Sequence, residues 1–453
     1  MRRSSHIDMC NGPLFKNVVE YTVPIILTSI IQLLFNAADL AVVGQFCGSN
    51  SVAAVGATSS LSHLIVNFFI GFSSGAGVTM AQAVGSGEQD KVHKVVHTTI
   101  PISMIGGVVV AAMGLLFSKT LLVWMGTPDE IIELSALYLK IYFCGAFFNM
   151  VYNFGAFLLR ATGDSKSPLY ILSISGVVNV VLNVIFVTLF HLDVAGVAFA
   201  TAISQALSAV LVIYTLMRRE DGARFEFKSM CIYMEPFKKM LTIGLPAGIQ
   251  TSVFSLSNVL IQSSINSFGT PAVSGNAAGA NIEGFVYAIM NAFGQTALNF
   301  AGQNIGAKNY ERLSKILRTC LACVVAAGVV TGVTAFLCRQ PLLSIYITDS
   351  AEAIEYGMQR LAYICLPYFI CGMMDVMGGM LRGMGKSLNS MIITIVGVCG
   401  IRIVFIMTLF KIKFFHSLSW LFLTYSVSWT LCAIVMLIVY KITKDKLVRT
   451  QHA

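Results

Sequence analysis

Long apolar stretches recur along the whole chain, and they constrain the fold more than any other feature. A helix that crosses about 30 Å of hydrocarbon needs about 20 mostly apolar residues. Twelve segments of this 453-residue chain qualify. They lie near 16–43, 52–80, 95–117, 131–159, 168–190, 194–217, 238–262, 273–301, 316–337, 353–381, 389–410 and 417–440. The sequence therefore predicts an all-α membrane protein with twelve transmembrane helices.

The sparse charge excludes a water-soluble domain. Only 11% of the residues are charged, whereas a soluble domain carries about 25%. The 30 Lys and Arg exceed the 21 Asp and Glu, but the basic residues lie in short runs between apolar stretches, as membrane topology requires. We therefore expect no nucleic-acid partner. The first apolar segment is too long for a signal peptide, so it is expected to remain as a span.

The distribution of basic residues predicts the orientation. With an even number of spans both termini lie on one side, and Lys and Arg concentrate in cytoplasmic connections. Of the 30 basic residues, four lie in the connections on the side opposite the termini and three within spans, which leaves 23 on the side of the termini. The four are Lys119, Arg339, Lys411 and Lys413, and the three are Lys140, Arg360 and Arg402. We therefore expect a multi-pass protein of the plasma (inner) membrane with both termini in the cytoplasm.

The two halves of the sequence repeat each other. Pro24 recurs as Pro246, and the run Arg160–Gly163 recurs as Arg382–Gly385, each at an offset of 222 residues. Because each repeat contains six spans, both begin on the same side of the membrane, which makes them parallel repeats. The expected organisation is a six-helix lobe over 1–217, a charged cytoplasmic linker over 218–235 and a second six-helix lobe over 236–453.

Four short motifs resemble those of the multidrug and toxic compound extrusion (MATE) family, within the multidrug/oligosaccharidyl-lipid/polysaccharide flippase superfamily. They are Asn36–Gly44 in the first span, Leu159–Asp164 after the fourth, Gly302–Ala307 after the eighth and Gly379–Gly383 in the tenth. The resemblance runs over nearly the whole chain. It implies two bundles in a V-shaped arrangement and export of drugs or metabolites, often cationic, against inward flow of Na⁺ or H⁺.

Ionisable residues inside a span are costly to insert, so each one is a functional hypothesis. Asp39 lies within the first span, with Asn36 one helical turn earlier on the same face. Burial favours the neutral form of a carboxyl and a nearby cation favours the charged form, so Asp39 can switch between them. These are the properties of a proton or Na⁺ coupling site. The alternative is a carboxylate that satisfies a neighbouring helix.

Amides and a hydroxyl complete the predicted N-terminal site. Asn179 and Asn183 lie four residues apart on one face of the fifth span, where amides can bridge to Asp39 or ligate a cation. Asn153 and Thr201 are candidate members of the same cluster, although such residues also serve as packing contacts between helices. Members of the resembled family commonly carry Asp at the position of Asn183, so this chain has one carboxylate fewer here.

The second half carries two acids within spans, Glu283 and Asp375, which we predict to bind the coupling cation or the substrate. Asp375 lies 222 residues after Asn153, so both halves place a polar side chain at this position. Arg402 is expected to neutralise one of the acids as an ion pair. No metal site is expected apart from Na⁺ at Asp39 or Asp375.

The function predicted from these features is secondary-active export of a cationic or amphipathic small molecule. Asp39, Glu283 and Asp375 are also the predicted substrate contacts. The alternative is a lipid-linked oligosaccharide flippase, which would need several cationic side chains around its cavity. The sequence contains no Walker motif, no H-E-x-x-H and no nucleophile triad, so an enzyme is not expected. We further expect no cofactor, contact with membrane lipid and a monomer.

Overall fold

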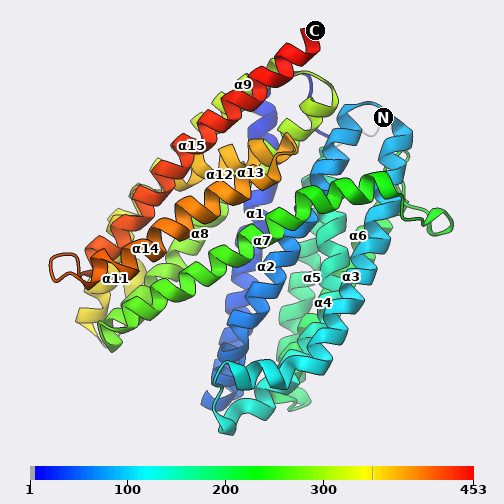
Figure 1. Ribbon diagram of the computed structural model, residues 1–453. Helices are drawn as coiled ribbons and strands as arrows, with labels where there is room; N and C mark the ends of the chain where they lie inside the picture. Colours follow the sequence, from blue (N-terminus) through cyan, green and yellow to red (C-terminus); the bar gives the residue numbers. More distant parts are fainter. Residues whose placement is uncertain (1–5, 349, 453) are drawn as a thin grey trace. The chain divides into compact units, whose positions relative to one another are not determined.

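Helices make up most of the chain that the structure describes. A computed structural model describes residues 6–348 and 350–452, and only the backbone at 49, 50, 52, 59, 60, 63 and 452. These residues contain no β-strand (Figure 1). Helices satisfy every backbone polar group within one segment, which hydrocarbon requires of a spanning chain. The predicted all-α class is confirmed.

The first half of the chain contains six long helices. They are α1 (Leu14–Phe46), α2 (Ser49–Gly85), α3 (Gln89–Trp124), α4 (Asp129–Ala161), α5 (Lys166–Val184) and α6 (Asp193–Met217). The π-helical segment η1 (Ile185–Leu189) extends α5, and the short 3₁₀ turn η2 (Phe227–Ser229) lies in the connection to the second half.

The second half repeats this order with more interruptions. It contains α7 (Met234–Asn266), α8 (Thr270–Gly306), α9 (Arg312–Leu337), α10 (Arg339–Ser344), α11 (Ala351–Cys365), α12 (Tyr368–Gly383), α13 (Ser387–Thr394), α14 (Ile401–Met407) and α15 (Leu418–His452). The π-helical η3 (Ile395–Gly400) joins α13 to α14, and the 3₁₀ turn η4 (Leu409–Lys411) follows α14.

Several corresponding helices of the two halves have equal lengths. Helices α1 and α7 each have 33 residues and each contains the repeated proline. Helices α2 and α8 each have 37 residues. Helix α4 corresponds to the bent pair α11 and α12, which begins and ends 222 residues later. The repeat therefore extends from short motifs to whole helices.

Nine helices among the described residues are long and apolar enough to cross a membrane, or ten if the bent pair α11 and α12 is one span. The two remaining segments of the expected twelve are α7 and α8. Both are long enough to span, but polar residues are spread along each of them. Polar residues in a spanning helix are tolerated where the helix faces protein rather than lipid.

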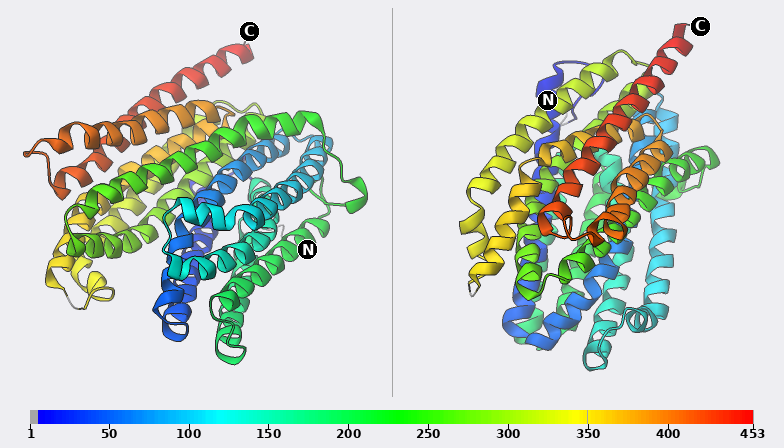
Figure 2. Two further views of the ribbon diagram at one scale, coloured as in Figure 1. Left: turned by 60° about the horizontal axis from the view of Figure 1, so that its bottom comes forward. Right: turned by 60° about the vertical axis from the view of Figure 1, so that its left-hand side comes forward.

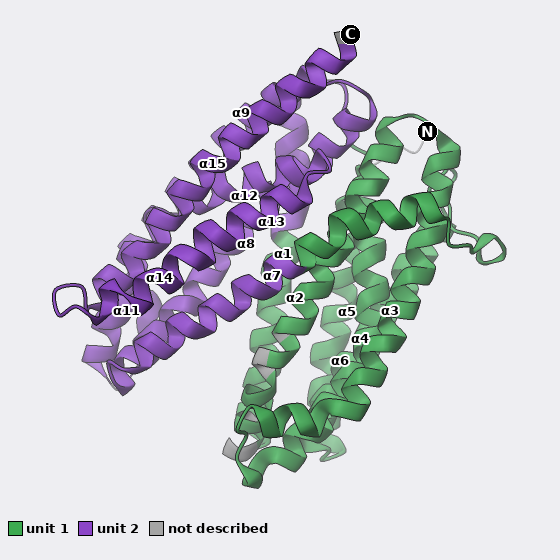
Figure 3. Cartoon of the chain, viewed as in Figure 1, with its two compact units in different colours: residues 1–7, 27–248 green, residues 8–26, 249–453 purple. Residues whose placement is uncertain are grey.

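The chain forms two compact units that do not coincide with the sequence repeats (Figure 3). Unit 1 comprises residues 1–7 and 27–248, and unit 2 comprises residues 8–26 and 249–453. Helices α1 and α7 therefore each contribute one part to either unit. In both helices the division falls two residues after the repeated proline, Pro24 or Pro246. A proline removes one hydrogen bond from the helix interior, which weakens the helix near this point.

Unit 1 is a helical bundle with a continuous apolar core. Helix α4 packs against α2, α3 and α6, and α5 packs against α6. These helices, coloured blue to green, lie side by side in both views of Figure 2. Fully buried side chains in the core include Ile100, Leu139, Phe143 and Phe154. In unit 2, α8 and α9 pack against α12, and α12 packs against α15.

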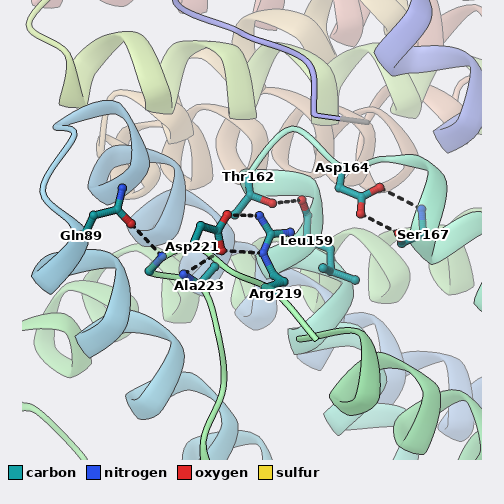
Figure 4. Close-up of polar contacts among 9 residues, drawn as sticks. Gln89, Leu159, Thr162, Asp164, Ser167, Arg219, Asp221 and Ala223 are labelled. Atoms are coloured by element: carbon teal, nitrogen blue, oxygen red, sulfur yellow. Dashed lines mark hydrogen bonds and ion pairs between the residues drawn. The ribbon is translucent and has the colours of Figure 1, made fainter. Parts of the chain in front are cut away.

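The connections at one end of unit 1 are fixed by polar contacts (Figure 4). The Asp164 carboxylate accepts hydrogen bonds from the backbone N–H and the hydroxyl of Ser167 at 2.9 and 2.6 Å, which caps the start of α5. The backbone N–H of Gly222 donates to Gln89 Oε1 at 2.7 Å, and Arg219 pairs with Asp221. The predicted linker is therefore anchored to α3.

Candidate functional site

Asp39 lies in the part of α1 that belongs to unit 1, beside the amides of α5. Asn183 Nδ2 donates to Asp39 Oδ1 at 2.5 Å, and also to Asn179 Oδ1 at 3.3 Å. Asn179 Nδ2 in turn donates to Thr201 Oγ1 of α6 at 3.4 Å. The structure thus connects four predicted residues from three helices. We refer to Asp39, Asn179, Asn183 and Thr201 as the Asp39 cluster.

Burial in the Asp39 cluster is greatest at the two amides of α5. Asn179 and Asn183 are buried, and Asn183 is completely inaccessible. Within the described residues, Asn183 Oδ1 has no hydrogen-bond donor although it is buried. Asp39 itself is only half-buried. The hydrogen-bonded pair of Asp39 and Asn183 therefore offers both a carboxylate and an amide oxygen that has no donor among the described residues.

Two tyrosines of α4 lie near the same carboxylate. Tyr138 and Tyr142 are close enough for the charge of Asp39 to act on both hydroxyls. Their rings stack with centroids 6.0 Å apart. Sequence reasoning did not single out this pair, although their spacing of four residues places them on one helix face.

Two predicted members lie apart from these contacts. Asn36 is exposed, three residues before Asp39 on α1. Asn153 Nδ2 donates to the Asn149 carbonyl at 2.9 Å, within α4. Asn153 follows Tyr138 by 15 residues on this helix, which corresponds to about 22 Å along its axis. The structure therefore does not place Asn153 beside Asp39.

Glu283 of α8 forms an ion pair with Arg360 of α11 in unit 2. Arg360 Nη2 and Nε donate to Glu283 Oε2 at 2.5 and 3.0 Å. Tyr368 of α12 donates its hydroxyl to Glu283 Oε1 at 3.1 Å. Arg360 Nη1 donates to Asn276 Oδ1 at 2.5 Å. We refer to Glu283, Arg360, Asn276 and Tyr368 as the Glu283 cluster.

Two glycines of α8 make room for this ion pair. A Cβ atom at Gly275 would overlap the backbone carbonyl of Ala353, so α8 and α11 approach closely there. A Cβ atom at Gly279, one turn later, would lie 3.0 Å from Arg360 Cδ. Small residues in α8 therefore allow the Arg360 side chain to run along α8 towards Glu283.

The ion pair predicted for Arg402 is wrong. Arg402 is 1% exposed and its Nε donates to Ser428 Oγ at 3.1 Å, while Nη1 and Nη2 have no hydrogen-bond partner among the described residues. Its guanidinium instead stacks on Tyr425, with Cζ 3.9 Å from the ring centroid. Attraction to an aromatic face replaces the expected acid.

Asp375 of α12 is separate from the Glu283 cluster. It follows Tyr368 by seven residues on the same helix, about 10 Å along the axis. One of its carboxylate oxygens, Oδ2, is buried without a hydrogen-bond partner in the part of the chain that the structure describes. The two acids predicted in this half therefore do not form one site.

Arg360 is the main residue that sequence reasoning missed. It was recognised only as a basic residue within a span, and it lies 77 residues from its partner in sequence. Charged residues inside spans commonly pair with one another. That tendency would have linked Arg360 to Glu283 or Asp375, but not decided between them.

The two clusters differ in chemistry. The Asp39 cluster offers a carboxylate with neutral oxygen and amide neighbours, which is suited to a proton or a hard cation. The Glu283 cluster neutralises its carboxylate internally. Among the described residues, no group of three or more His, Cys, Asp or Glu side chains could hold a metal ion.

Comparisons with known proteins agree with the fold and the repeat. The MatE family profile matches residues 24–185 and 246–408, two blocks with the offset of the sequence repeat. A probable multidrug resistance protein of Bacillus subtilis (strain 168), YoeA, is 29% identical over 398 residues, which cover 86% of this chain and 85% of the relative. The probable multidrug resistance protein NorM of Thermotoga maritima is 26% identical over 399 residues, covering 86% and 84%.

A solved structure shows the same fold over the full length. It is described as a MOP superfamily transporter from Pyrococcus furiosus in which reversed polarity of the binding pocket suggests a different function. The TM-score is 0.92 with 20% sequence identity, and the match covers 99% of each chain. The profile match over most of the chain assigns the family: the protein is a multi-pass membrane protein that belongs to the MatE family.

Proposed function

We propose that this protein exports small molecules by antiport, with inward movement of Na⁺ or H⁺ driving outward movement of the substrate through alternating access. The observation that carries the proposal is the Asp39 carboxylate, which accepts a hydrogen bond from the Asn183 amide and forms no ion pair with a basic side chain among the described residues. The names of the relatives, which describe multidrug resistance, support a drug or metabolite as substrate.

The Asp39 cluster supports cation coupling by its donor set. Hard cations prefer carboxylate and amide oxygens, and the buried Asn183 Oδ1 is an acceptor without a donor among the described residues. A proton would act differently, by neutralising Asp39 and changing its hydrogen bond with Asn183. Both ions fit this arrangement, so we propose Asp39, Asn179, Asn183 and Thr201 as the coupling site, with Asn36 and Asn153 as further candidates.

The membrane potential supplies the driving force in this scheme. One positive charge moving inward contributes about 2.3 kcal/mol per 100 mV. One inward charge is sufficient to concentrate an uncharged substrate outside the cell at least tenfold, and two are needed for a singly charged cation, since each 1.4 kcal/mol corresponds to a factor of ten. Glu283 and Asp375 are proposed as further cation or substrate contacts. For Glu283 this role requires that its ion pair with Arg360 opens.

The exporter is favoured over a flippase for lipid-linked oligosaccharides. A diphosphate needs several free cationic groups, whereas Arg360 is engaged by Glu283 and Asn276, and Arg402 is stacked on Tyr425. We further propose that the exporter is a monomer of the plasma membrane, that both termini are cytoplasmic and that the lobes are 1–217 and 236–453.

The direct test is transport in inverted membrane vesicles. A ΔpH or ΔNa⁺ is imposed across vesicles that contain the protein, and the accumulation of a panel of cationic dyes is measured. Accumulation that requires one of the gradients supports antiport and identifies the ion. Vesicles without the protein, and vesicles in which the gradient has been collapsed by an ionophore, are the controls. Equal accumulation with and without both gradients would reject ion coupling.

A further inference from the structure

Arg360 carries a buried positive charge that the proposed transport cycle does not use. It is 6% exposed and directs Nε and Nη2 to a single carboxylate oxygen of Glu283. We infer that the guanidinium of Arg360 occupies the position beside Glu283 that a free cation would otherwise occupy.

The surroundings hold the guanidinium at this place. Nη1 donates to Asn276 Oδ1, and the Asn276 amide donates to Gln262 Oε1 of α7 at 2.8 Å. The guanidinium carbon lies 5.6 Å from the ring centroid of Phe422 and 6.0 Å from that of Tyr425. Arg360 is thus fixed by hydrogen bonds on three of its nitrogens and by aromatic rings of α15, as a planar cation is best held.

The repeat identifies the residue at the related position of unit 1. The residue 222 positions before Arg360 is Tyr138, and Tyr138 lies near Asp39. The same place in the fold therefore carries a neutral hydroxyl in unit 1 and a guanidinium in unit 2. This substitution leaves the charge of Asp39 available and cancels the charge of Glu283.

The consequence concerns which unit takes the coupling ion. A free cation can bind Glu283 only if it displaces a tethered cation whose effective concentration is high. Unit 2 therefore takes up no cation at Glu283 while the pair is intact, and the coupling ion binds in unit 1. This last statement rests on the proposed function, whereas the role of Arg360 at Glu283 does not.

An ordinary structural ion pair between α8 and α11 makes a different prediction. Removing Arg360 would then loosen the protein, and no small cation would restore it specifically. If Arg360 substitutes for a cation, its removal leaves a cation site at Glu283. Small cations should then stabilise the variant, and they should do so only while Glu283 is present.

The experiment compares the thermal stability of purified full-length Arg360→Ala and wild type in detergent. The titrants are NaCl, KCl and methylguanidinium chloride, at constant ionic strength with choline chloride. We expect Na⁺ or methylguanidinium to raise the Tm of Arg360→Ala by on the order of 2 °C or more beyond any shift in wild type. The gain should vanish in the double variant Glu283→Gln/Arg360→Ala.

Arg402→Ala is the matched control, because Arg402 is equally buried but has no acidic partner, and it should show no such gain. If Arg360→Ala folds and no cation raises its Tm more than that of wild type, the inference is wrong. If it does not fold, a folded double variant supports charge compensation at Glu283, and an unfolded double variant overturns it. A gain in Arg360→Ala without any Na⁺ effect on wild type would support the role of Arg360 while counting against Na⁺ coupling at Asp39.

Discussion

The acids of the two units, Asp39 and Glu283, both accept hydrogen bonds from side chains of other helices, but these partners differ in charge. Asp39 accepts a hydrogen bond from a neutral amide. Glu283 accepts two from a guanidinium and one from a tyrosine hydroxyl. Removing one partner of a buried ion pair is strongly destabilising, which makes a charged acid in such a pair hard to neutralise. We therefore propose that Asp39, rather than Glu283, changes its charge during the cycle.

This difference shows that the repeat duplicates the scaffold and not the electrostatics. Positions related by 222 residues carry Tyr138 and Arg360, Asn153 and Asp375, and Val180 and Arg402. In each pair the second unit has the ionisable member, apart from the phenol of Tyr138. The predicted coupling acid of unit 1 is Asp39, and the related position in unit 2 is Ile261.

The largest effect is predicted for Tyr138→Arg, which introduces into unit 1 the basic residue that unit 2 has at the related position. This variant places a guanidinium near Asp39 and should abolish ion-driven export. Displacing a buried ion pair costs about 3–5 kcal/mol, which corresponds to a loss of at least about 100-fold in cation affinity. Dye efflux at matched expression measures it. Tyr138→Phe is the control and should retain transport; full activity of Tyr138→Arg would break the comparison.

A smaller effect is expected from Asn183→Ala. A hydrogen bond to a charged group contributes about 1.5–3 kcal/mol, so loss of the amide should weaken ion coupling about tenfold or more. The measurement is the ion concentration that gives half-maximal efflux. Asn183→Asp restores an oxygen ligand and should retain coupling. An unchanged half-maximal concentration in Asn183→Ala would exclude Asn183 from the site.

Tyr368→Phe tests the Glu283 cluster with a smaller change. It removes one hydrogen bond to Glu283 Oε1 but leaves the ion pair with Arg360. We expect a loss of about 1 kcal/mol in the free energy of unfolding, with the ion dependence of export unchanged. Unfolding in detergent and dye efflux are measured on the same preparation. A shifted ion dependence would mean that Glu283 takes part in coupling.

The smallest effect is predicted outside the membrane, at Asp221 in the linker. Burial opposes ionisation of this carboxyl, but the hydrogen bond and charge of Arg219 outweigh burial and lower its pKa below the ordinary value. A lowered carboxyl pKa adds stability that is present above the pKa of the unfolded chain and is lost as the pH falls through the lower folded value.

Because the pair is partly exposed, Asp221→Asn should lower the free energy of unfolding at neutral pH by less than about 1 kcal/mol. Export should be unchanged. Thermal unfolding at neutral pH provides the measurement. A large loss of export would show that the linker contacts in Figure 4 matter for the cycle.

The sequence predicts the helices well, for a physical reason. Apolar length is a local pattern, the repeat aligns the two halves, and the spacing of Asn179 and Asn183 places both amides on one helix face. The contact of Asn183 with Asp39 spans 144 residues, and the sequence offered it only beside the alternative of a cation ligand. The predicted partner of Arg402 was an acid, but helix packing placed Tyr425 against it.

The pairing of Arg360 with Glu283 could not be predicted because it depends on how α11 lies against α8. Gly275 and Gly279 permit that close approach, and a glycine pair in a sequence does not indicate which helix it accepts. Asn153 is the opposite case. Its polarity made it a candidate, but its distance along α4 from Tyr138 separates it from Asp39.

The central claim is that the exchangeable charge of this protein is Asp39. The most direct test is ion-driven efflux from proteoliposomes containing Asp39→Asn or the paired variant Glu283→Gln/Arg360→Met, at equal protein content and with folding checked by thermal unfolding. The account predicts that Asp39→Asn folds but loses both ΔpH-driven and ΔNa⁺-driven efflux, while the paired variant, which retains no buried charge at the Glu283 cluster, keeps it. Full gradient-driven efflux by Asp39→Asn would contradict the account and move the coupling site to unit 2.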